Sequence, residues 1–215
     1  MRWRVKGVVF QTCGLSRRRL RAASAVLLAA SAMGTLLSAC ASEAEREEPR
    51  EYLDESTAAT VTVVRTPLVF ARERSDLAAN ARDYVTLAAA AVNSAGRVHY
   101  ILVTYRWSTI DVRLDPDRPR PTDPLVVAAD DRRIQLTAPT HSPHDAGIDT
   151  PVHPPPGPRR EPAVYTIDLA TLRFIAAARR LVVRTGASDT APTYEIWTDG
   201  RRALNDFVDR MQGPR

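Results

Sequence analysis

Half of the 16 prolines in this 215-residue chain lie in one stretch, from Pro139 to Pro162. Proline lacks the backbone N–H that helices and sheets require, and its ring clashes with the preceding turn of a helix. A stretch so dense in proline cannot form the interior of either element. It predicts a long exposed loop, partly polyproline in character, over residues 139–162. Regular structure is expected before this loop and again after it.

The clearest sign of regular structure is a pair of apolar runs, 84–92 and 98–107. The segment Asn93-Ser94-Ala95-Gly96 joins them, and asparagine and glycine accept the positive φ angles of a tight turn. This pattern predicts an antiparallel hairpin. Apolar residues occupy both faces of the second run, so we expect that strand near the centre of a sheet.

Two helices are predicted near the C-terminus. Asp168 is the expected N-cap of a helix that reaches about Ala178. A stripe of apolar residues at helical spacing predicts a final helix over 201–211. We expect the large aromatic side chains in the core, among them Trp107, Tyr194, Trp197 and Phe207.

Shorter segments rich in β-branched residues complete the sheet. Leu68 to Phe70 follows Pro67, which indicates an edge strand or a kink. The expected fold class is α+β, a mainly antiparallel sheet with two helices of the C-terminal half packed on it. The additional strands are predicted at 60–64, 68–70, 125–128, 134–137, 164–167, 181–183 and 194–197.

The N-terminus has the layout of an export signal. Four arginines between positions 17 and 21 precede an apolar run from Ala22 to Leu37. That run is shorter than the roughly 20 apolar residues that a membrane span needs. The segment 16–21 also looks like a twin-arginine export signal, so general secretion and twin-arginine export both stay open.

A cysteine ends this leader. The residues Leu37-Ser38-Ala39-Cys40 resemble the lipobox of bacterial lipoprotein precursors, in which a leucine and two small residues precede an invariant cysteine. The resemblance implies cleavage between Ala39 and Cys40 and a diacylglyceryl group on the Cys40 sulfur. Such a protein is held on a membrane surface without spanning it. Ala41 in place of an aspartate implies the outer membrane, with the protein facing the periplasm.

The lipobox divides the chain into three parts. Residues 1–39 are a cleaved signal peptide, residues 40–56 are the lipidated cysteine and a flexible acidic tether, and residues 57–215 are a single globular domain. The layout of residues 57–211 is also similar to that of uncharacterised envelope lipoproteins of proteobacteria, a resemblance that carries no site residues. The other cysteine, Cys13, lies in the leader, so no disulfide is expected in the exported domain.

Charge excludes one class of partner. The formal net charge is +5, but the leader contributes seven basic residues and no acidic ones. The exported domain is therefore slightly acidic, and it lacks the basic surface that nucleic-acid binding requires.

The chain has none of the usual catalytic or nucleotide-binding motifs, and no cofactor is expected. We therefore expect a non-catalytic envelope lipoprotein that binds an unknown partner protein or takes part in an assembly. Two alternatives stay open. One is metal capture by His141, His144 and His153 in the proline-rich loop, although a structural zinc site needs four ligands on an ordered frame. The other is a hydrolase of unfamiliar type that uses His99 as its base.

Overall fold

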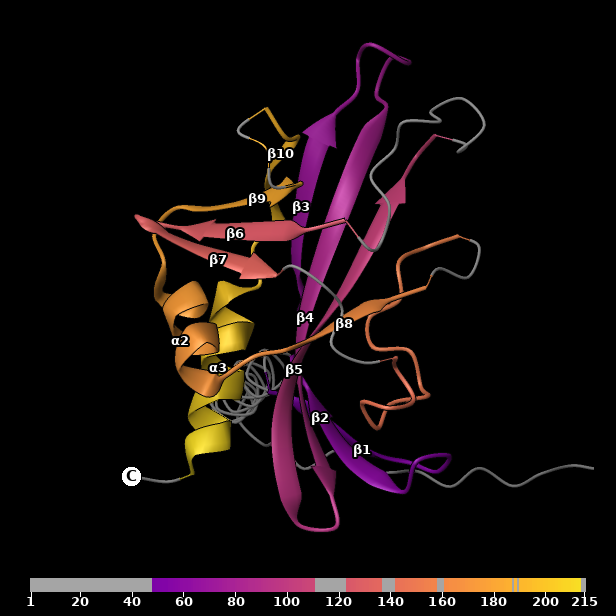
Figure 1. Ribbon diagram of the computed structural model, residues 1–215, viewed down its shortest axis with the longest axis vertical. Coiled ribbons are helices and arrows are strands. Elements are labelled where there is room, and N and C mark those ends of the chain that lie inside the picture. Colours follow the sequence, from indigo (N-terminus) through magenta and orange to yellow (C-terminus); the bar gives the residue numbers. More distant parts are fainter. Residues whose placement is uncertain are drawn as a thin grey trace, which may run out of the picture. The chain divides into compact units, whose positions relative to one another are not determined.

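The sheet is built around a long hairpin (Figure 1). The computed structural model describes residues 48–110, 123–136, 142–157, 161–186, 188 and 190–213. Strands β4 (Arg82–Ser94) and β5 (Arg97–Ser108) pair along their whole length, as the sequence predicts. The turn residues Ala95 and Gly96 have φ angles of 52° and 82°. Two positive φ angles are what a type I′ turn requires, and this turn matches the twist of the paired strands.

Ten strands of the described residues form one antiparallel sheet. The order is β1-β2-β4-β3-β10-β9-β6-β7, and β5 pairs with the other edge of β4 and with β8. The expectation of a mainly antiparallel sheet is confirmed. The remaining strands are β1 (Arg50–Asp54), β2 (Ala59–Val63), β3 (Leu68–Glu73), β6 (Leu125–Ala129), β7 (Arg132–Leu136), β8 (Ala163–Thr166), β9 (Leu181–Thr185) and β10 (Thr193–Thr198).

The chain bends at Arg65 and Thr66, directly before Pro67, between β2 and β3. Both strands pair with the same edge of β4, since β2 faces residues 90–93 and β3 faces residues 82–87. The predicted kink is therefore confirmed. The prediction of an edge strand is wrong for β3, because β10 pairs with its other side. Proline interrupts the ladder between the two segments rather than within either of them.

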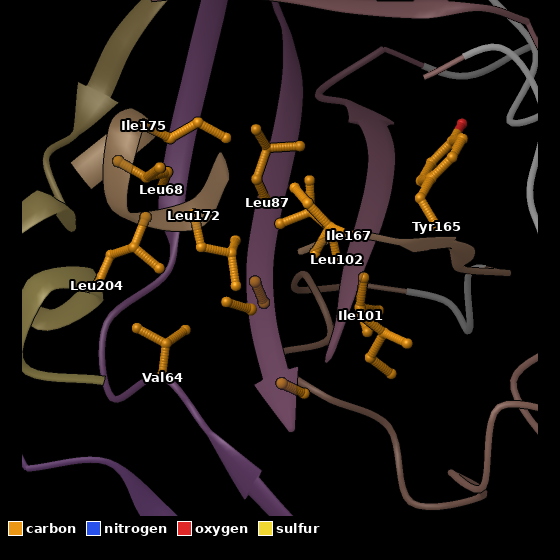
Figure 2. Packing of buried hydrophobic residues seen from close by; sticks show 14 of the residues in the cluster. Val64, Leu68, Leu87, Ile101, Leu102, Tyr165, Ile167, Leu172, Ile175 and Leu204 are labelled. Atoms are coloured by element: carbon orange, nitrogen blue, oxygen red, sulfur yellow. The ribbon is translucent and has the colours of Figure 1, made fainter. Parts of the chain in front are cut away.

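Two helices are present in the described residues, and both lie in the C-terminal half, as expected. Helix α2 (Leu169–Ala177) begins after Asp168, whose Oδ1 accepts a hydrogen bond from the backbone N of Thr171 at 2.6 Å. Helix α3 is Arg201–Gln212. Apolar side chains of both helices pack against one face of the sheet, as Figure 2 shows for Val64, Leu68, Leu87, Leu102, Leu172, Ile175 and Leu204.

The folded region begins earlier than the sequence predicts. The predicted tether extends to residue 56, but Arg50–Asp54 form the edge strand β1, which pairs with β2. Asp54 is 1% exposed. The residues of this strand do not alternate between apolar and polar side chains, so the sequence does not predict it. In the structure Leu53 is largely exposed. Backbone hydrogen bonds to β2 hold β1 in the sheet.

The proline-rich loop differs from its prediction in one respect. Within its described part, residues 142–157, the side chains of Ala146, Ile148 and Val152 are buried in the core. Most residues of this part are exposed, as predicted, and these three buried side chains attach it to the core of the domain. It contains no strand or helix, as its prolines require.

Candidate functional site

Trp197 in β10 is a large aromatic side chain on the surface, 55% exposed. The rings of Tyr84 and Trp197 meet edge to face, with centroids 6.1 Å apart. Tyr84 in turn stacks on Trp107 at 4.0 Å. The guanidinium carbon of Arg82 lies 4.7 Å from the centre of the Trp197 ring, within cation–π range. We call these four residues the aromatic cluster.

Strand pairing explains how the aromatic cluster forms. Tyr84 in β4 and Trp107 in β5 are direct cross-strand partners, so their rings lie on the same face of the sheet. Trp107 is fixed further by a hydrogen bond of 3.2 Å from its Nε1 to Oγ1 of Thr86. Leu87 alternates with Thr86 and packs toward the helices, so the aromatic cluster lies on the opposite face.

Trp197 occupies an irregular position of β10. Ile196 pairs with Phe70 and Thr198 pairs with Val69, so β10 has one residue more than β3 at this point. Such bulges redirect a side chain. The prediction that Trp197 lies in the core is wrong, while Tyr194 and Phe207 are buried as predicted.

A hollow lined by arginines adjoins the aromatic cluster on the same face. It has a volume of about 580 Å³ over strands β7, β6, β9 and β10. Thr193 borders both this hollow and a second one of about 410 Å³ beside Trp197. We call the larger one the arginine hollow, and its charged lining residues are Asp130, Asp131, Arg133, Arg180 and Arg184.

Two acidic residues on this face, Glu73 and Asp130, are paired with neighbouring groups. Glu73 accepts a hydrogen bond from Arg82 at 3.1 Å. Asp130 accepts from the backbone amides of Arg180 at 2.8 Å and Arg179 at 3.1 Å. These amides, that of Arg180 first, hold the pKa of Asp130 below its ordinary value. The face presents aromatic and guanidinium groups together with the carboxylates of Asp131 and Glu195, which line the two hollows.

The two described histidines of the proline-rich loop, His144 and His153, have different partners. His144 Nδ1 lies 3.1 Å from a carboxylate oxygen of Asp149 at the surface. His153 Nε2 donates to the backbone carbonyl of Val64 at 2.6 Å, so this nitrogen carries a proton. His141 lies outside the described residues. Within the described part of the chain, no three histidine, cysteine, aspartate or glutamate side chains are grouped as metal ligands.

His99, the base of the hydrolase alternative, contacts the proline-rich loop. Its Nε2 donates to the carbonyl of Ala146 at 3.3 Å. This arrangement is the interior hydrogen bond of a half-buried histidine, and no serine or carboxylate partner for His99 is found among the described residues. The predicted cleavage residue Ala39 and the predicted lipidation residue Cys40 lie outside the described residues.

Comparisons with protein families, with curated proteins and with solved structures gave no match for this chain. In the part that the structure describes, no helix has the length and apolar character needed to cross a membrane. The site is therefore characterised by its geometry alone.

Proposed function

We propose that the mature protein is a non-catalytic, lipid-anchored component of the bacterial cell envelope that binds a partner protein through the aromatic cluster. Cys40 anchors it, at the outer membrane with the domain facing the periplasm. The observation that carries the binding function is the exposed ring of Trp197, supported by Tyr84 and Arg82.

Physical chemistry favours this surface for protein binding. Tryptophan, tyrosine and arginine are the residue types that most often dominate the energy of protein interfaces. Trp197 is already held by the ring of Tyr84 and the guanidinium of Arg82, so little side-chain freedom remains to be lost when a partner covers it. Burial of an exposed aromatic side chain contributes about 2 kcal/mol, and the desolvated cation–π contact with Arg82 adds to it.

The short connection to Cys40 restricts where the partner can be. Nine residues separate Cys40 from the first residue of β1. A chain of this length spans at most about 30 Å even when fully extended. A domain anchored in this way stays close to the membrane surface, so the proposed partner is a membrane protein or another envelope component near that surface.

Site-specific photocrosslinking in intact cells tests the binding function. The full chain carries a photoreactive phenylalanine analogue at position 197, or at position 53 as a matched control. Leu53 is 62% exposed on β1 and lies outside the aromatic cluster. We expect one defined crosslinked species from position 197 that is lost when Arg82→Ala is added, and none from position 53. Equal crosslinking from both positions, or from neither, would contradict the proposal.

Lipidation is tested separately. Cells that grow with labelled palmitate should incorporate the label into the wild-type protein and not into the Cys40→Ser variant. The variant should also leave the membrane fraction, because one acyl-bearing residue is the proposed anchor. Unchanged labelling and unchanged sedimentation with membranes would remove Cys40 as the anchor.

A further inference from the structure

A hollow of about 440 Å³ lies where the start of β1, the end of β2 and the proline-rich loop meet. We call it the β1 hollow. Two exposed arginines line it, Arg50 of β1 and Arg65 just after β2. The loop contributes Pro151, His153 and Pro154 to the wall. The volume falls within the range of about 300–1,000 Å³ that small-molecule sites occupy.

Hydrogen bonds fix the loop side of the β1 hollow. His153 Nε2 donates to the carbonyl of Val64 at 2.6 Å, directly after β2. The amide of Thr150, another residue of the wall, donates to the buried carboxylate of Asp54 at 2.8 Å. A wall that is held at both points keeps its shape without a ligand, so binding requires little ordering.

Strand pairing places Arg50 at the hollow. Arg50 and Val63 are direct cross-strand partners, and Tyr52 follows two residues later on the same face of β1. All three residues line the hollow. The guanidinium carbon of Arg50 lies 6.0 Å from the centre of the Tyr52 ring, at the limit of cation–π range. The charged end of Arg50 therefore lies beside another residue of the wall.

The two acidic residues of β1 are directed elsewhere. Glu51 lies on the opposite face of the strand, where its Oε2 accepts from Thr62 Oγ1 at 3.2 Å and from Arg210 at 3.4 Å. Asp54 is 1% exposed and accepts backbone amides of the loop. None of the described residues that line the hollow is an aspartate or a glutamate. The wall therefore offers guanidinium groups to an anion.

The surroundings of the two arginines indicate the kind of anion. Guanidinium groups bind phosphate in a bidentate manner, through two parallel hydrogen bonds. The exposed rings of Pro151 and Pro154 place apolar surface in the same hollow. This combination suits a phosphate that carries an apolar chain better than it suits a free phosphate.

The β1 hollow is also close to the proposed anchor. Arg50 is the first residue of β1, and nine residues separate it from Cys40. Val63 pairs with Ala90 of β4, six residues from Tyr84 of the aromatic cluster, which is a separation of about 20 Å along the strand. A headgroup in the hollow therefore does not cover the aromatic cluster.

From these observations we infer that the β1 hollow binds the phosphate of an anionic phospholipid headgroup in the membrane that holds Cys40. The inference rests on the anchoring part of the proposed function. An anchor that keeps the domain at the membrane raises the effective concentration of headgroups, so a site of modest affinity is sufficient. Headgroup binding then orients the domain on the membrane.

Coupling through the thiol of Cys40 allows a test without lipidation in cells. Cys40 is the only cysteine of the exported chain, so the purified chain from residue 40 onward can be attached to a maleimide lipid in vesicles. The vesicles contain either anionic phosphatidylglycerol or zwitterionic phosphatidylcholine. We expect the amides of Arg65, Val152 and His153 to exchange hydrogen more slowly on phosphatidylglycerol. The docking constant, obtained from the ratio of exchange rates, should fall about fivefold in Arg50→Gln and in Arg65→Gln.

Arg202→Gln is the matched control, because Arg202 is an exposed arginine of α3 outside the hollow, and it should keep the wild-type ratio. Glycerol 3-phosphate tests a free phosphate as the ligand. Added to phosphatidylcholine vesicles at the concentration of phosphatidylglycerol, it should leave exchange unchanged. Circular dichroism and the melting temperature confirm that each variant is folded.

Three results would each overturn the inference. They are equal exchange on the two kinds of vesicle, an equal loss of docking in Arg202→Gln, and protection by glycerol 3-phosphate that matches phosphatidylglycerol. The acidic residues that precede β1, Glu48 among them, are present in the coupled chain, so any competition from them is included. Because the lipid is attached chemically, these results are independent of the palmitate experiment on Cys40.

Discussion

The carboxylate Oδ2 of Asp54 lies 2.8 Å from the backbone nitrogen of Thr150, a residue 96 positions further along the chain. The same oxygen accepts the amide of Asp149 at 2.8 Å, and Oδ1 accepts the amide of Thr57 at 3.3 Å. This buried carboxylate therefore connects the edge strand β1 to the proline-rich loop. One side chain supplies the acceptors that a loop without regular structure cannot supply for itself.

These contacts make stability depend on pH. Desolvation alone would raise the pKa of Asp54, but the amides of Thr150, Asp149 and Thr57 outweigh it and hold the pKa below its ordinary value of 3.8. A lowered folded-state pKa means that this stabilisation is complete above the unfolded pKa and is lost as pH falls through the folded one. We expect Asp54→Asn to reduce the free energy of unfolding by about 2 kcal/mol at pH 7.

The difference between wild type and Asp54→Asn should shrink as pH falls below about 4, because the wild-type carboxylate is then neutralised. Urea denaturation at several pH values measures it. Hydrogen exchange at the amides of Asp149 and Thr150 provides the local readout, and both should exchange faster in the variant. A stability difference that does not change with pH would contradict the assigned role of the charge.

Arg74 contacts two aspartates in very different surroundings. Its Nη1 donates to Asp83 at 2.9 Å, where the Asp83 side chain is 4% exposed, and its Nε donates to Asp76 at 3.1 Å, where the Asp76 side chain is 62% exposed. Loss of one partner of a buried ion pair is unfavourable by about 3–5 kcal/mol, while an exposed pair contributes about 1 kcal/mol or less. We expect Asp83→Ala to be far more destabilising than Asp76→Ala, as measured by urea denaturation. Similar values for the two variants would contradict this assignment.

Asp168 caps helix α2 with both carboxylate oxygens. Oδ1 accepts the backbone amide of Thr171 at 2.6 Å, and Oδ2 accepts its hydroxyl at 2.9 Å. We expect Asp168→Ala to lower the free energy of unfolding by about 1 kcal/mol and Asp168→Asn to lower it less, because asparagine is also a good N-cap. Thermal unfolding followed by circular dichroism compares them, and an equal loss in both variants would argue against capping as the cause.

Gly200 has no room for a side chain. A Cβ atom at this position would lie 2.5 Å from the carbonyl oxygen of Thr66 and 2.7 Å from that of Pro67. These are backbone atoms just before β3, so they cannot move aside as a flexible side chain can. We expect Gly200→Ala to destabilise the domain by about 1–3 kcal/mol. Gly213→Ala is the control, since nothing lies within 4 Å there, and its smaller loss should reflect only the positive φ of 72°.

Local patterns in the sequence were sufficient for much of the fold. The β4–β5 hairpin, the Asp168 cap and the apolar stripe of α3 each depend on residues close together in the chain. Turn chemistry, capping and periodicity act over a few residues, so the amino-acid order alone determines them. The resemblance of residues 37–40 to a lipobox is likewise a local pattern, and the lipidation of Cys40 stays a prediction.

Only the tertiary structure decided which surfaces meet. Asp54 lies in a segment that reads as a flexible tether, and its burial comes from loop amides almost a hundred residues away. The exposure of Trp197 results from the extra residue of β10 opposite β3, and the hollow beside Arg50 exists because the proline-rich loop lies against β1 and β2. Such contacts join residues distant in sequence, and their energy depends on the register and packing of the whole sheet, which no local pattern contains.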